Sequence, residues 1–101
     1  MGELEEISFQ IISTVGASRS YYIEAIQAAK NSNFTLADEF MVQGEEAFVQ
    51  GHKAHAKLIQ AEANGKSIQM NLLLTHAEDQ LMSAEAFGII AREFIDIYKT
   101  R

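Results

Sequence analysis

The sequence has 101 residues, the size of a single domain, which leaves no room for a second catalytic domain. Eight Lys and Arg against 14 Asp and Glu give a net charge of -6, which argues against nucleic acid and anionic membrane surfaces as partners. The absence of cysteine excludes disulfides, a thiol nucleophile and thiolate metal sites. The absence of proline predicts few loops and long uninterrupted helices.

The chain also shows no sign of a membrane segment. Its apolar stretches, such as Leu72 to Leu74, are far shorter than the roughly 18 residues that a membrane span requires. The N-terminus is acidic, whereas a signal peptide begins with basic residues. We therefore expect a cytoplasmic protein that is not inserted into a membrane.

The first thirty residues have the periodicity of a helix. Apolar and small residues recur at steps of three and four positions, which places them on one face. This face comprises Leu4, Ile7, Ile11, Val15, Ser18, Tyr22, Ala25 and Ala29. A polar break at residues 31–34 ends the pattern. Thr35, followed three residues later by Asp38, resembles a capping box and predicts the start of a second helix.

The second helix is expected to continue to about Ala63. Its apolar face comprises Ala37, Met41, Gly44, Phe48, Gly51, His55 and Leu58. The two glycines on this face indicate close approach of a neighbouring helix rather than breaks. Gly65 is suited to the left-handed position that ends a helix, and Ser67 can cap the next one.

A third helix is predicted from about Ile68 to Lys99, and it is apolar on two faces. One face comprises Met70, Leu73, Leu74, Ala77, Leu81, Ala84, Gly88, Ala91, Ile95 and Tyr98. The other comprises Leu72, His76, Asp79, Met82 or Ser83, Ala86 and Ile90. A lone three-helix bundle covers only one of these faces.

These elements predict an all-α fold in which residues 1–101 form one antiparallel, up-down-up three-helix bundle. Three long helices in so short a chain bury a modest fraction of their surface, and the second face of the third helix stays uncovered. Self-association is the expected remedy, with that face packed against its own copies around a symmetry axis.

Two of the three histidines, His52 and His55, have spacings typical of structural residues. His52 and His55 are three residues apart, and neither His-Glu-x-x-His nor Glu-x-x-His occurs, which excludes a metalloprotease motif and a di-iron carboxylate site. We expect His52 to be a solvated side chain. His55 lies on the apolar face of the second helix, which favours a hydrogen-bonded packing role.

His76 lies with Asp79 on one face of a very apolar turn, and two interpretations are open. An ionised carboxylate in an apolar setting is costly unless it is paired or bound to a cation, so in the first interpretation the two side chains satisfy each other. Alternatively, a half-buried His76 acts as a nucleophile. The chain has no nucleotide-binding motif, so other proteins would have to supply and remove a phosphoryl group.

Several runs resemble the lactose/cellobiose-type enzyme IIA family of the bacterial phosphoenolpyruvate-dependent sugar phosphotransferase system. The first helix carries the family's Gly-x-x-Arg-Ser and Glu-Ala, with Phe and Ala after the turn, at Gly16, Arg19, Ser20, Glu24, Ala25, Phe34 and Ala37. The second carries Ala-His and Glu-Ala-x-Gly at Ala54, His55, Leu58, Glu62, Ala63 and Gly65. The active-site run is matched at His76, Ala77, Asp79, Leu81 and Met82.

The resemblance implies a homotrimer of three-helix subunits that acts as a phosphotransferase component in sugar transport. His76 would accept the phosphoryl group of phospho-HPr and pass it to a cysteine of the cognate IIB component. Asp79 would bind a divalent cation, commonly magnesium, near the trimer axis. The transported sugar would be a β-linked disaccharide of the lactose, cellobiose or chitobiose type. The alternative is a non-catalytic trimeric interaction module in which His76 and Asp79 are only structural.

Two residues of the active-site run depart from the family. Glu78 stands where the family usually has Gln, and we expect its charge to disfavour a phosphorylated His76 or to need a compensating partner. Gln80 stands where the family usually has a second His, which removes an imidazole from the site and leaves an amide able to hydrogen-bond.

Overall fold

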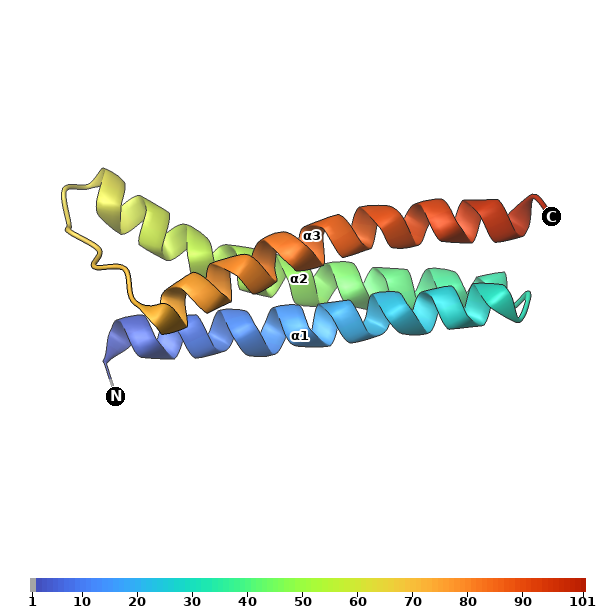
Figure 1. Cartoon of the computed structure of the whole chain (residues 1–101), viewed down its shortest axis with the longest axis horizontal. Coiled ribbons are helices and arrows are strands. Elements are labelled where there is room, and N and C mark those ends of the chain that lie inside the picture. The colour runs from blue at the N-terminus through green and yellow to red at the C-terminus, as the bar shows by residue number, and fades with distance from the viewer. Residues whose placement is uncertain (1) are drawn as a thin grey trace.

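The computed structural model describes residues 2–101 as three helices joined by two short connections (Figure 1). The helices are α1 (Glu3–Lys30), α2 (Phe34–Ala63) and α3 (Leu72–Lys99). Each runs along the length of a molecule that measures 52 × 23 × 19 Å, and the chain reverses direction at each connection. No strand occurs in residues 2–101, which confirms the all-α prediction. None of these helices is both long and apolar enough to span a membrane.

The first connection is shorter than predicted. Helix α2 begins at Phe34, and its cap is Asn33, whose side-chain Oδ1 accepts a hydrogen bond of 3.2 Å from the backbone N–H of Leu36. Thr35 therefore lies inside the helix, and the predicted capping box does not form. Asn is among the most effective N-cap residues, so the earlier Asn33 takes the position.

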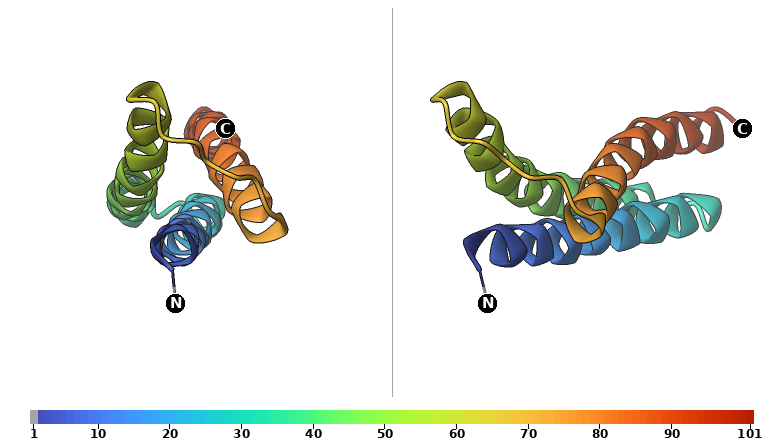
Figure 2. Two further views of the ribbon diagram at one scale, coloured as in Figure 1. Left: turned by 90° about the vertical axis from the view of Figure 1, so that its left-hand side faces the viewer. Right: turned by 60° about the vertical axis from the view of Figure 1, so that its left-hand side comes forward.

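The start of α3 also differs from the prediction, because the helix begins at Leu72 rather than near Ile68. Asn71 is the cap, and its Oδ1 accepts a hydrogen bond of 2.8 Å from the backbone N–H of Leu74. Gly65 has the expected positive φ, of 91°. Residues 66–71 have no regular secondary structure, because this segment spans the gap between the end of α2 and the start of α3 (Figure 2).

The predicted inward faces of the helices form the core, in two clusters along the bundle. The cluster near the N-terminus combines Ile7, Ile11, Val15, Ala54, Leu58, Leu74, Ala77, Leu81 and Ala84. The cluster near the C-terminus combines Tyr22, Ala25, Ala28, Ala29, Ala37, Met41, Ala91 and Ile95. The periodicity of the sequence thus identified the buried side of each helix correctly.

Tyr22 is the large side chain around which the middle of the bundle closes. A Cβ atom at Gly44 of α2 would lie 2.5 Å from its Cε1, and one at Gly88 of α3 would lie 2.9 Å from its Cζ. The Ser18 hydroxyl donates a hydrogen bond of 2.7 Å to the carbonyl oxygen of Gly44, which joins α1 to α2 at the same level. Burial raises the pKa of the Tyr22 hydroxyl, which keeps it neutral. Gly44 therefore permits close packing as predicted, and so does Gly51, where a Cβ atom would lie 2.6 Å from Val15 Cγ1.

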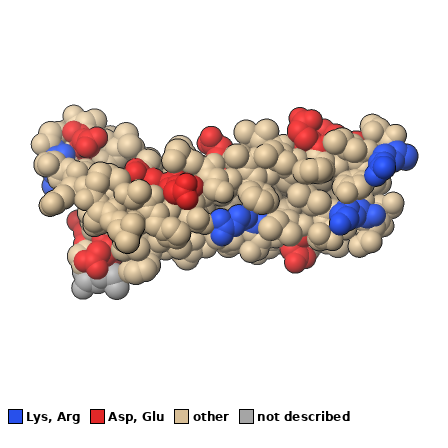
Figure 3. Space-filling model, in the orientation of Figure 1, with Lys and Arg blue, Asp and Glu red and all other residues tan. Residues whose placement is uncertain are grey.

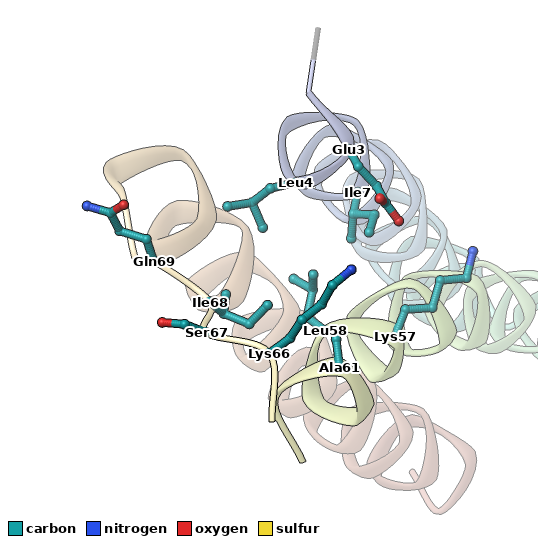
Figure 4. Close-up of a pocket in the computed structure, with 10 residues that line it drawn as sticks. All are labelled: Glu3, Leu4, Ile7, Lys57, Leu58, Ala61, Lys66, Ser67, Ile68 and Gln69. Carbon is teal, nitrogen blue, oxygen red and sulfur yellow. The ribbon is translucent and has the colours of Figure 1, made fainter. Parts of the chain in front are cut away.

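One end of the bundle is open. The last turns of α2 diverge from the other two helices, and the segment before α3 crosses the gap (Figure 2). A cavity of about 270 Å³ lies there, with Leu4, Ile7, Leu58 and Ile68 as its apolar lining and Lys57 and Lys66 among its polar residues (Figure 4). His76 and Asp79 do not line this cavity.

Replacing Gly44 tests the packing around Tyr22. The new methyl group of Gly44→Ala would overlap the ring, at a cost of about 1–3 kcal/mol, against a gain in helix propensity of at most about 1 kcal/mol. We expect a net loss of stability, measured by urea unfolding at fixed protein concentration. Gly16→Ala is the control, because its Cβ would meet no atom within 4 Å, and it should be neutral or stabilising by about 0.5–1 kcal/mol. Equal stability of the two variants would contradict this account.

Candidate functional site

The second apolar face predicted for the third helix is exposed in the structure. We call it the outer face of α3, and it comprises Leu72, His76, Asp79, Met82, Ala86, Ile90, Phe94 and Ile97. Every one of these side chains is exposed, and Leu72 is 86% accessible. The space-filling view shows charged side chains scattered among large uncharged areas (Figure 3). An apolar strip of this length marks an interaction surface.

His76 and Asp79 lie together on this face, one turn apart. Neither is buried in the single chain, whereas the sequence suggested a half-buried histidine and a buried aspartate. The physical reason is that α1 and α2 both pack on the opposite side of α3. No hydrogen bond or ion pair joins the two side chains, although three residues on a helix place them within reach. The imidazole of His76 is therefore accessible to another molecule.

Glu78 points away from His76. Two residues along a helix correspond to a rotation of about 200°, so the side chains leave opposite sides. Glu78 Oε2 lies 2.7 Å from His55 Nε2 on α2, and these side chains are 32% and 19% exposed. We expected Glu78 to need a partner, and in the structure this partner is His55. The expectation that Glu78 adds negative charge directly beside His76 is wrong in this geometry.

Gln80 lies on the same side of α3 as His76, because four residues make about one turn. Its Oε1 accepts a hydrogen bond from the guanidinium Nη1 of Arg19 on α1. The two departures from the family pattern thus have partners on different helices. Glu78 faces α2, and Gln80 faces α1.

The two histidines of α2 have the structural settings expected from the sequence. His52 is exposed, and its ring centroid lies 6.1 Å from that of Phe48. His55 is partly buried and hydrogen-bonded to Glu78. Neither lies on the outer face of α3.

A metal ion would find only one carboxylate ligand on the outer face of this chain. Within residues 2–101, no group of three or more His, Asp and Glu side chains is close enough together to hold an ion. Asp79 is exposed, and it forms no ion pair with another described residue. Its oxygens suit magnesium or calcium, but such ions need more ligands than one chain supplies here. The residues fit a cation only if Asp79 side chains from several copies converge.

The spacing of the sequence could have revealed the orientation of Glu78, because residues two apart never share a face. Its partner could not be found in this way. His55 and Arg19 lie 23 and 61 positions from the residues that they contact. Only the packing of α1 and α2 against α3 brings them to the site.

Comparison with known proteins gives a consistent result. Residues 6–99 match the model of the family described as "PTS system, Lactose/Cellobiose specific IIA subunit". The oligo-beta-mannoside-specific EIIA component of Bacillus subtilis (strain 168) is 36% identical over 97 residues, which cover 96% of this chain and 88% of that protein.

Solved structures are similar over almost the whole chain. The crystal structure of the cellobiose-specific enzyme IIA from Bacillus anthracis is 43% identical with a TM-score of 0.96, and the match covers 99% of this chain and 92% of that one. The IIA(Chitobiose) chain of Escherichia coli, solved in complex with HPr, is 29% identical with a TM-score of 0.85. That match covers 99% of this chain and 97% of that one.

Proposed function

Because the chain belongs to the lactose/cellobiose-specific IIA family of the phosphotransferase system, we propose that it is a phosphocarrier in sugar uptake. It accepts a phosphoryl group from phospho-HPr on His76 and passes it to a cysteine of a IIB component. The observation that carries this proposal is the exposed imidazole of His76, within the run that resembles the active site of the family. A relative solved in complex with HPr supports the choice of donor.

The transfer needs little from this chain except an accessible nucleophile in a fixed position. The lone pair of an unprotonated imidazole nitrogen of His76 attacks phosphorus and forms a P–N bond. The P–N bond to the imidazole of HPr breaks, and its electron pair stays on the nitrogen of HPr. In the second step a thiolate of IIB attacks the same phosphorus, and His76 regains its lone pair. In-line positioning and exclusion of water by the docked partners supply most of the catalysis.

A trimer would cover the outer face of α3. Its residues follow one another at steps of three and four, which is the spacing of a coiled-coil seam. Three copies around a threefold axis would bury Ile90 and Ile97 against their equivalents. His76 and Asp79 differ by about 60° around the helix, so an axis facing Asp79 leaves His76 at the flank. The site would thus stay open to a partner in the assembled trimer.

Such an axis would bring three Asp79 carboxylates together. A divalent cation, magnesium by the family resemblance, would be held by them and would reduce their mutual repulsion. Its contribution is structural, and no step of the phosphoryl transfer depends on it. The phosphoryl group is handled by His76 and its neighbours at the flank.

The sugar is expected to be a β-linked disaccharide or a related glycoside. The similar proteins carry names that refer to oligo-β-mannosides, cellobiose and chitobiose. A phosphocarrier does not contact the sugar, so the exposed residues of this chain do not distinguish these substrates.

The alternative function, a non-catalytic trimeric module, requires His76 and Asp79 to serve structure alone. The absence of a hydrogen bond between them removes the simplest form of that role within one chain. The phosphorylation experiment separates the two functions, since a module would take up no phosphate.

His76→Gln should abolish phosphorylation. Incubation with phosphoenolpyruvate, enzyme I and HPr should load the wild type with one acid-labile phosphate per chain, measured by mass spectrometry. His52→Gln and His55→Gln are the controls, and both should still be loaded. Acid-labile phosphate on His76→Gln would rule out the assignment of this residue.

The outer face of α3 should mediate trimer formation. Sedimentation equilibrium should give about three times the chain mass for the wild type and a lower mass for Ile90→Lys, because a buried charge is costly. Ile59→Lys is the control, since Ile59 is similarly exposed but lies on α2. A monomeric wild type, or an Ile90→Lys variant that assembles as well as the wild type, would contradict the proposed interface.

Removal of the cation should weaken the trimer only when Asp79 is present. A strong chelator should lower the trimer stability of the wild type, because three carboxylates would then repel one another. Asp79→Leu should contain no bound metal by elemental analysis and should not respond to the chelator. Asp96→Leu, at an exposed position off the outer face, should behave as the wild type. Unchanged metal content in Asp79→Leu would exclude Asp79 as a ligand.

A further inference from the structure

Arg19 is a partly buried cation that has no carboxylate partner. Within residues 2–101, the ion pairs join His55 to Glu78 and Asp38 to Arg92 and Lys99, and none involves Arg19. The chain has 14 acidic residues and a net charge of -6, so an arginine without an acidic neighbour is unexpected. A positive charge held in this way is suited to an anion from outside the chain.

The guanidinium is held against Gln80, which lies one turn after His76 on α3. Side chains on a helix lean toward its N-terminus, so the Gln80 side chain extends back over the turn that carries His76. Arg19 Nη1 donates to Gln80 Oε1 at this place. His76 and Gln80 are separated by one turn, about 5.4 Å along the axis of α3, and a side chain as long as that of Arg19 can span this distance. The remaining guanidinium N–H groups and the Gln80 amide N–H groups are donors of the kind that phosphate oxygens accept.

The acidic residue nearest in sequence does not compete for this arginine. Glu78 leaves the opposite side of α3 and is engaged by His55 on α2. The site therefore separates its charges, with the carboxylate directed toward α2 and the guanidinium held against Gln80 on the α1 side.

We propose that Arg19, positioned by Gln80, donates hydrogen bonds to the phosphoryl group carried on His76 and so stabilises the phosphorylated form of the chain. This inference rests on the proposed function. It adds a residue of α1 to a site otherwise built on α3, and it gives a role to Gln80, which replaces the second histidine usual in the family.

The test measures the equilibrium of phosphoryl transfer from phospho-HPr to the wild type and to Arg19→Gln. Charge-assisted hydrogen bonds to phosphate are about twice as strong as neutral ones, and we expect Arg19→Gln to lower the equilibrium constant roughly tenfold. Arg19→Lys keeps the charge but loses the planar fork of donors, and it should lose about two- to fivefold. The ³¹P resonance of the phosphohistidine should also shift in Arg19→Gln, which a purely structural role would not require.

Two controls define the outcome. Arg92→Gln removes another arginine that contacts a second helix, and Glu78→Gln removes a charge two residues from His76; both should stay within about twofold of the wild type, because neither side chain faces the phosphoryl group. If Arg19→Gln does not fold, Arg19→Lys and Gln80→Ala replace it, and each should show a reduced constant.

If the folded Arg19 variants have the same equilibrium constant as the wild type, this inference is overturned. The proposed function is unaffected by that result. A wild type that takes up no phosphate would overturn both. An equal loss in Arg19→Gln and Arg92→Gln would mean that net charge, not contact, governs the equilibrium, and it would also overturn the inference.

Discussion

The arrangement of this protein depends on a constraint at α3, which is apolar on two opposite faces while the chain supplies neighbours for only one. Leu74, Ala77 and Leu81 on the inner face pack into the core with α1 and α2. Because those helices occupy the same side, the outer face stays exposed, and the nucleophile proposed here lies on it. The outer face of α3 therefore has two roles in the proposed function. It is the apolar surface that another copy would cover, and it presents the reactive side chain of His76.

The three helices pack closely near the middle of the bundle, at the level of Tyr22. Tyr22 fills the space between Gly44 and Gly88, and Ser18 bonds the backbone of α2 at the same level, so the three helices are fixed in register near their middle. The cavity at the open end is lined in part by Ile7 and Leu58 of the N-terminal core cluster (Figure 4). Interhelical bonds from Glu78 and Gln80 then hold the helix of His76 on both flanks.

These two flanks give the site an asymmetry that affects its chemistry. The α2 side holds a carboxylate that is already paired with His55, and the α1 side holds a guanidinium with no acidic partner. If His76 carries the phosphoryl group, as we propose, this doubly negative group leaves α3 on the side of Gln80 and away from Glu78. The unusual Glu78 is thereby tolerated, since its charge is directed toward α2.

The sequence by itself determined the number of helices, their buried faces, the glycines that permit close packing and the exposed second face of α3. These features follow from local periodicity and side-chain size, which the order of residues specifies directly. It also singled out His76 and Asp79, through their spacing and through a resemblance carried by neighbouring residues.

The tertiary structure alone decided where α3 begins, because the divergent end of α2 must be bridged by residues 66–71 before Asn71 can cap the helix. It also decided that His55 contacts Glu78 and that Arg19 reaches Gln80. Such pairings join residues far apart in the chain, and only the packing of three helices against one another brings them together.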